Sequence, residues 1–268
     1  MGNALFVVWR ESLEAFLIIG ILYAWLKAEN DTGRGRAALL IGIVGGIVMA
    51  LLLGWGLLSV QDDLSGDALE AFQIGMILIA AALITQMVLW MRKHGRHMKT
   101  QLQAGIEAAS KRAGYVGIAV IAGLAVAREG AETVIFLYGL AQSGDTQALL
   151  FGASAGFVIA IITAWLAAYG LSRLNLGLLL QLSSVLLLII ASALLVAAVD
   201  RLIGMDWLPG LIDPLWDTSG ILDDNATTGK LLADFGGYRA RPALMMLLAW
   251  CAYWAAILFI FRKQPARA

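Results

Sequence analysis

Long apolar stretches dominate the pattern of the chain, and short polar segments separate them. A helix of about 20 apolar residues is needed to cross the hydrocarbon core of a bilayer. Seven stretches reach this length, and most are apolar on every face, which excludes amphipathic helices of a soluble domain. The pattern therefore predicts an all-α, polytopic membrane protein with seven transmembrane helices. The predicted spans cover residues 4–26, 37–60, 68–91, 115–139, 147–171, 178–199 and 242–261.

The loops between these spans differ in charge. Segments 27–36 and 92–113 and the tail after residue 261 are basic, as cytoplasmic segments usually are. Loops of the opposite parity are acidic, and segment 200–241 holds seven Asp against four basic residues. This distribution predicts an N-terminus outside the cytoplasm, a cytoplasmic C-terminus and an extracytoplasmic cap over 200–241. Residues 101–112 have helical composition and are expected at the cytoplasmic surface.

The overall composition agrees with a membrane protein and narrows its chemistry. Hydrophobic residues make up 60% of the 268 residues, charged residues 14%, and the net charge is zero. A neutral chain offers no electrostatic basis for nucleic-acid binding. The lone cysteine, Cys251, cannot form an internal disulfide, and His94 and His97 both lie in the basic loop. Without a histidine inside a span, a haem held within the bilayer is not expected.

An internal repeat is visible around two charged motifs. Arg10-Glu11-Ser12-Leu13-Glu14 in the first span resembles Arg128-Glu129-Gly130-Ala131-Glu132 in the fourth, and Gln73 and Gln181 occupy similar places in the third and sixth. Copies three spans apart have opposite orientation, which predicts a 3+3 inverted repeat, a transporter design. The expected units are residues 1–91, 92–113 (basic loop), 114–199, 200–241 (cap) and 242–268 (extra helix and tail).

The two motifs hold almost all of the charge that is predicted within the membrane. One charge near the bilayer centre costs about 2.5–3.5 kcal/mol on insertion scales, so six such groups indicate a function. Residues three apart share a helix face, and residues four apart can pair. Each motif thus offers two carboxylates on one face, with an arginine within reach of the second. The alternative is a pair of buried ion pairs that only stabilise helix packing.

The carboxylates predict a path for a cation. With all groups ionised, four carboxylates and two arginines carry a net charge of −2, which a divalent ion would neutralise. Carboxylate oxygens suit hard cations. At a rise of about 1.5 Å per residue, Glu11 and Glu132 lie about 10 Å below the outer surface, and Glu14 and Glu129 about 15 Å. We therefore predict metal ligation by these four glutamates on two levels, with Arg10 and Arg128 holding them.

Three further residues are accessory candidates. Gln73 and Gln181 could complete a coordination shell, although they could equally join helices by hydrogen bonds. Glu70, with Asp62, Asp63 and Asp67, could form an acidic entrance, although an ordinary solvated loop explains the same pattern.

At these motifs the chain resembles the oxidase-dependent iron transporters, which include fungal high-affinity iron permeases and bacterial EfeU-type ferrous iron permeases. The resemblance covers nearly the whole chain and is greatest for the bacterial members. Supporting segments are Trp90-Met91-Arg92-Lys93, Arg173-Leu174-Asn175-Leu176-Gly177 and Gly237-Tyr238-x-x-x-Pro242. One departure is Gln73 after Phe72, where the family often has a glutamate.

The resemblance implies seven spans, iron as the transported substrate and the glutamates of both motifs as its pathway. It also implies a periplasmic iron-binding protein and a peroxidase-like or oxidase partner. No catalytic residue and no resident cofactor are expected, and a homo-oligomer is left open. Two alternatives remain: transport of manganese, lead or another divalent metal, and a membrane di-metal carboxylate enzyme. The enzyme is disfavoured because such sites use Glu-x-x-His pairs, which the spans lack.

Overall fold

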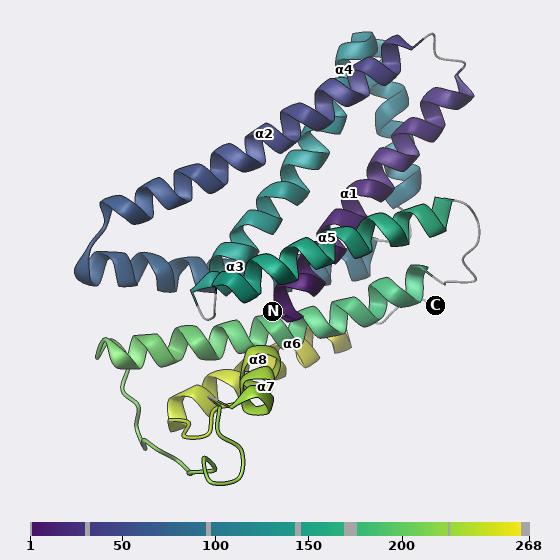
Figure 1. Ribbon diagram of the computed structural model, residues 1–268. Coiled ribbons are helices and arrows are strands. Elements are labelled where there is room, and N and C mark those ends of the chain that lie inside the picture. The colour runs from purple at the N-terminus through teal and green to yellow at the C-terminus, as the bar shows by residue number, and fades with distance from the viewer. Residues whose placement is uncertain are drawn as a thin grey trace.

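The computed structural model describes residues 2–29, 33–94, 98–142, 146–168, 176–224 and 226–263. His97, Asp145, Arg173 and the end of the tail lie outside these ranges. The described residues form eight helices and no strand, which agrees with the predicted all-α class, although the short helix within the predicted cap was not expected (Figure 1). The helices are α1 (Gly2–Ala28), α2 (Arg34–Asp63), α3 (Gly66–His94), α4 (Met98–Ala141), α5 (Thr146–Ala168), α6 (Leu176–Gly204), α7 (Thr227–Gly236) and α8 (Leu244–Lys263).

Five of the described helices are long and apolar enough to cross a bilayer: α2, α3, α5, residues Gln181–Gly204 of α6, and α8. The chain is therefore a polytopic membrane protein. The other two long helices, α1 and α4, carry the charged motifs. The first part of α4 includes residues 101–112, which are helical as expected, and it joins the predicted span at Gly114. Gly114 has φ +57°, a backbone conformation that glycine adopts without a side-chain clash.

The end of α6 corrects the sequence prediction. The sixth span was expected to stop at residue 199, but α6 continues to Gly204 and carries Asp200 and Arg201. Arg201 stays in the helix because neighbouring helices supply acceptors. Its Nη1 donates to Gln73 Oε1 at 2.9 Å, and its Nη2 donates to the carbonyl of Gln142 at the end of α4. A cation near a helix C-terminus is favoured by the helix dipole.

Two close helix pairs hold the bundle together. Helix α2 packs along α4, and α1 packs along α5. A Cβ atom on Gly46 would meet the carbonyl oxygen of Gly123, and one on Gly156 would meet that of Leu5. Leu5 and Gly123 each stand six residues before the first glutamate of a motif. The α1–α5 contact at Leu5 and the α2–α4 contact at Gly123 thus have the same sequence position relative to the charged motif of their own helix.

The α2–α4 contact predicts the effect of one added methyl group. A Cβ on Gly46 would lie 2.7 Å from the Gly123 oxygen, whereas a Cβ on Gly45 would meet nothing within 4 Å. We expect Gly46→Ala to destabilise the protein by about 1–3 kcal/mol through overpacking. Gly45→Ala is the matched control and should not destabilise it, because alanine favours a helix over glycine. Thermal unfolding in detergent would measure the difference, and equal stability of the two variants would contradict the packing.

The centre of the bundle is formed by α3 and α6. Ile77, Ala80 and Ile84 of α3 are buried, and Leu187, Ile190 and Leu194 of α6, each 110 residues later, are buried too. This register aligns Gln73 with the buried Ser183 and not with Gln181, which is exposed. Gln73 is partly buried and Gln181 is exposed, so the two side chains have different surroundings, and their equivalence in a repeat stays a prediction.

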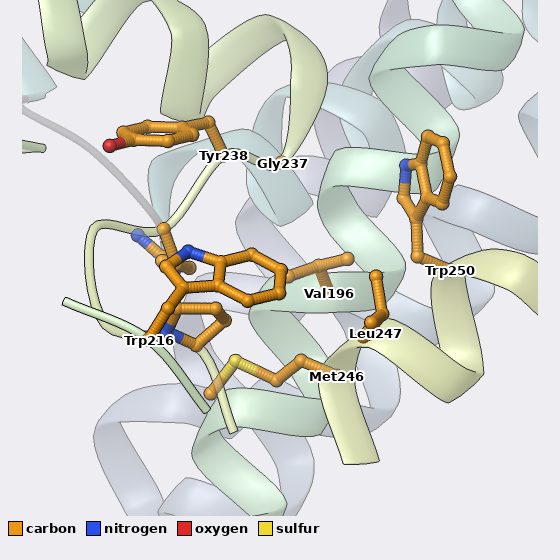
Figure 2. Close-up of a pocket in the computed structure, with 9 residues that line it drawn as sticks. Val196, Trp216, Gly237, Tyr238, Met246, Leu247 and Trp250 are labelled. Atoms are coloured by element: carbon orange, nitrogen blue, oxygen red, sulfur yellow. The ribbon is translucent and has the colours of Figure 1, made fainter. Parts of the chain in front are cut away.

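The segment between α6 and α8 lies beside α6, on the opposite side of the bundle from α2 (Figure 1). Its two arms pair through Leu215 N to Pro242 O at 2.8 Å and Thr218 N to Ala240 O at 2.9 Å. Hydrogen bonds from Ser219 and Arg241 lower the pKa of the exposed Asp217 to about 2, so this carboxylate stays charged at ordinary pH. Figure 2 shows Trp216 and Tyr238 lining a small pocket with residues of α6 and α8.

The N-terminus lies on the same side of the bundle as this segment. Asn3 Nδ2 donates to the carbonyl of Asp234 in α7 at 2.5 Å, and Phe6 meets Phe235 edge to face at 6.3 Å between ring centroids. Helix α7 therefore covers the first turns of α1.

Candidate metal-ion site

The first charged motif lies in the buried interior of α1. The side chains of Arg10 and Glu11 have 0% exposure, and Glu14 is also buried. Arg10 Nε lies 3.1 Å from Glu14 Oε1, and its Nη1 lies 3.7 Å from Glu11 Oε1. The Arg10–Glu14 pair is the one that the i, i+4 spacing predicts, and the approach of Arg10 to the adjacent Glu11 is additional to it.

The second motif, on α4, is arranged differently. Arg128 Nε donates to Glu132 Oε1 at 2.9 Å and lies 4.0 Å from Glu129 Oε1. Glu129 is buried, but the Arg128 side chain is 51% exposed. The same sequence pattern therefore gives one fully enclosed arginine and one half-exposed arginine.

The two motifs meet in one cluster of carboxylates. Glu11, Glu14 and Glu129 each offer an oxygen, and these oxygens all lie within 4.8 Å of one another. Glu132 is close enough to interact electrostatically with all three. Levels at about 10 and 15 Å below the surface differ by about 5 Å, which is compatible with this oxygen spacing, so the arrangement on two levels stays a prediction.

A single turn of α3 contacts the arginines of both motifs. Met87 and Met91 accept from Nη1 and Nη2 of Arg10, at 3.1 and 2.7 Å. Trp90, on the same turn, lies beneath the Arg128 guanidinium, 5.2 Å from Cζ to the ring centroid. This distance is within the range of a cation–π interaction. Trp90 and Met91 belong to the Trp-Met-Arg-Lys segment that supported the family resemblance.

The three accessory candidates have surroundings different from those of the carboxylate cluster. Gln73 accepts from Arg201, Gln181 is exposed, and Glu70 is exposed near the start of α3. Gln73 belongs to a second polar group, in which Tyr138 donates to Gln61 Oε1. These residues connect the ends of α2, α3, α4 and α6. Among the described contacts, none joins the three accessory candidates to the carboxylate cluster.

The cluster has the chemistry of a site for a hard or borderline cation. Both oxygens of Glu11, Oε2 of Glu129 and Oε2 of Glu132 are buried and accept no hydrogen bond from the described residues. Arg10 and Arg128 balance only part of this buried negative charge, and uncompensated buried charge is costly, so the cluster favours a further proton or cation. Oxygen ligands favour Mg²⁺, Mn²⁺ and similar ions over soft ones, and the fully ionised cluster retains a charge of −2.

Sequence reasoning missed Met87, Met91, Trp90 and Arg201. Methionine and tryptophan in an apolar span give no pattern distinct from packing, and Arg201 stood two residues beyond the predicted span. The recurrence of Trp90-Met91 in the family segment was the one signal that could have pointed to this turn.

Comparison with known proteins identifies relatives that share nearly the whole length of the chain. The chain is 29% identical over 261 residues to the ferrous iron permease EfeU of Shigella sonnei and to that of Escherichia coli O157:H7, covering 97% of this chain and 94% of each relative. EfeU of Yersinia pestis is 27% identical over the same length. No solved structure gives a significant match. The model of the iron permease FTR1 family matches residues 1–263. This protein is thus a permease rather than an enzyme, and it belongs to the iron permease FTR1 family.

Proposed function

We propose that this permease imports iron ions across the bacterial cytoplasmic membrane. Glu11, Glu14, Glu129 and Glu132 are the transient ligands, and Arg10 and Arg128 adjust the charge of the site. The observation that carries the proposal is the approach of Glu11, Glu14 and Glu129 to within 4.8 Å inside a membrane protein of the iron permease family.

The electrostatics of the site favour a divalent ion. Four carboxylates leave a charge of −2 after both arginines are counted, and a divalent cation brings the cluster to neutrality. Neutrality lowers the cost of holding charge in the low-dielectric interior. The three relatives compared above are named ferrous iron permeases, which supports Fe²⁺ as the transported form.

We further propose seven spans and a 3+3 inverted repeat, with α8 as the additional helix. The equivalent α1–α5 and α2–α4 contacts support this arrangement, as does the matching burial of α3 and α6. The units are residues 1–91, 114–199 and 242–268, separated by the basic loop 92–113 and the cap 200–241. In such repeats the substrate site lies between the two copies, where α1 and α4 bring the motifs together.

The cap and the N-terminus face the periplasm in this proposal. The Asn3–Asp234 hydrogen bond supports their common side, and the exposed basic residues Arg92 and Lys93 support a cytoplasmic position for the opposite end. A periplasmic iron-binding protein and a peroxidase-like or oxidase partner would deliver iron at the cap.

Uptake of radiolabelled iron into vesicles containing the purified protein tests the proposal. We expect labelled iron to accumulate only in vesicles that contain the protein, and to accumulate faster when a reductant is present. Excess unlabelled Mn²⁺ or Pb²⁺ should reduce this accumulation only weakly. Vesicles without protein are the control. No accumulation with or without reductant, or preferential accumulation of manganese or lead, would overturn iron as the cargo.

A further inference from the structure

The guanidinium of Arg10 contacts two kinds of ligand atom. Carboxylate oxygens of Glu11 and Glu14 lie 3.7 Å from its Nη1 and 3.1 Å from its Nε, and the sulfur atoms of Met87 and Met91 accept from its Nη1 and Nη2. The two methionines are four residues apart on α3, so their side chains share one face of that helix. Arg10 is completely buried, so its contacts with these four residues determine where it lies.

The two ligand types have opposite metal preferences. Thioether sulfur is a soft ligand that selects ions such as Cu⁺ and Ag⁺, whereas carboxylate oxygen suits harder ions. An uncovered pair of sulfurs beside the carboxylates would give a mixed site. The Nη1 and Nη2 atoms of Arg10 donate to both sulfurs, at 3.1 and 2.7 Å, and so compete with an ion for them, whereas oxygens of Glu11 and Glu129 accept no hydrogen bond from the described residues.

The neutral sulfurs also position Arg10 without changing the charge of the site. They accept its N–H groups but bring no negative charge, so the carboxylates keep their charge for the ion. Arg128 has a different environment, because Trp90 and partial exposure take the place of the two sulfurs.

We infer that Met87 and Met91 are specificity-determining residues, which hold Arg10 in place and are in turn covered by it, so that the transported ion meets oxygen ligands and soft monovalent ions are rejected. This inference rests on the proposed function and adds the metal class that the site excludes. It assigns a role to two residues that no charged motif contains.

Binding of Ag⁺ to the purified protein tests the covering role. All variants carry Cys251→Ser, because this exposed thiol would itself bind silver. We expect Arg10→Leu to tighten Ag⁺ binding at least about tenfold, since it uncovers two soft ligands. Adding Met87→Leu and Met91→Leu to Arg10→Leu should return the affinity to the starting value. No gain in Arg10→Leu, or a gain that persists in the triple variant, would overturn the inference.

Iron uptake tests the positioning role in a background that keeps Arg10. Leucine conserves the volume of methionine, so Met87→Leu/Met91→Leu should fold. We expect its KM for iron to rise about tenfold, as for other residues that orient metal ligands, with kcat nearly unchanged. Met76→Leu, at a buried position elsewhere on α3, should leave KM unchanged. If the Arg10→Leu protein is not produced in the membrane, the KM of Met87→Leu/Met91→Leu tests the inference instead. An unchanged KM in that double variant overturns the inference.

The two experiments also separate this inference from the proposed function. Silver binding requires no iron transport, so a protein that fails to import iron would still report whether Arg10 covers the sulfurs. Normal iron import with no change in either experiment would remove the methionines from the mechanism and leave the carboxylate site intact.

Discussion

Replacing Glu129 with glutamine is expected to reduce iron uptake by at least about a hundredfold, because substitutions in residues that merely orient metal ligands already cost 10–100-fold. Glu129 is the residue of α4 whose oxygen lies within 4.8 Å of both Glu11 and Glu14 of α1. Glutamine keeps the size of the side chain but removes its charge. The ion would then lose the carboxylate through which the second motif joins the first.

Initial rates of labelled-iron uptake, normalised to the amount of protein in the membrane, measure this effect. Glu70→Gln is the matched control, because it removes the same charge from an exposed position near the start of α3. Glu11→Gln and Glu14→Gln should be as severe as Glu129→Gln. Uptake near the wild-type rate in Glu129→Gln would show that the carboxylates only stabilise helix packing.

The helices could be predicted from the sequence because the membrane imposes their length. Each predicted span overlaps a described helix, although residues 169–171 of the fifth span lie outside the described ranges, and α6 extends five residues beyond its predicted end. That end was placed before Asp200 because a charge normally stops a span. In the structure, Gln73 and the Gln142 carbonyl accept from Arg201, and the helix continues. Such acceptors come from distant parts of the chain, so a local pattern cannot reveal them.

The carboxylate cluster was predictable for a related reason. The i, i+3 and i, i+4 spacings place the motif residues on one helix face, and charge inside a membrane needs a partner. The cluster's compactness was not predictable, since it depends on how closely α1 and α4 approach. Their approach is a tertiary contact between distant parts of the chain, and the periodicity of a single helix carries no information about it.

The difference between the two arginines could not be predicted, because the motifs are nearly identical in sequence. Met87 and Met91 enclose Arg10, while Trp90 stacks on Arg128 and leaves it half exposed. Both environments come from one turn of α3. A turn composed of Met, Val, Leu and Trp has the same apolar pattern whether it packs against another helix or an arginine.

This difference in environment predicts unequal effects on stability. Arg10→Leu should lower the free energy of unfolding by about 3–5 kcal/mol, because it leaves the buried carboxylates of Glu11 and Glu14 without a counter-charge. Arg128→Leu should cost under about 1 kcal/mol, because a half-exposed ion pair contributes little. Unfolding of the purified variants in detergent would measure both values.

The origin of the Arg10 effect can be isolated with a second substitution. If the loss comes from uncompensated negative charge, Glu14→Gln should restore part of the stability of Arg10→Leu while destabilising the protein when Arg10 is present. This sign reversal is the coupling that a double-mutant cycle detects. A divalent cation should also stabilise Arg10→Leu, because it binds the folded carboxylate cluster and supplies the missing charge. Equal losses for Arg10→Leu and Arg128→Leu would show that the enclosure by α3 does not distinguish the two motifs.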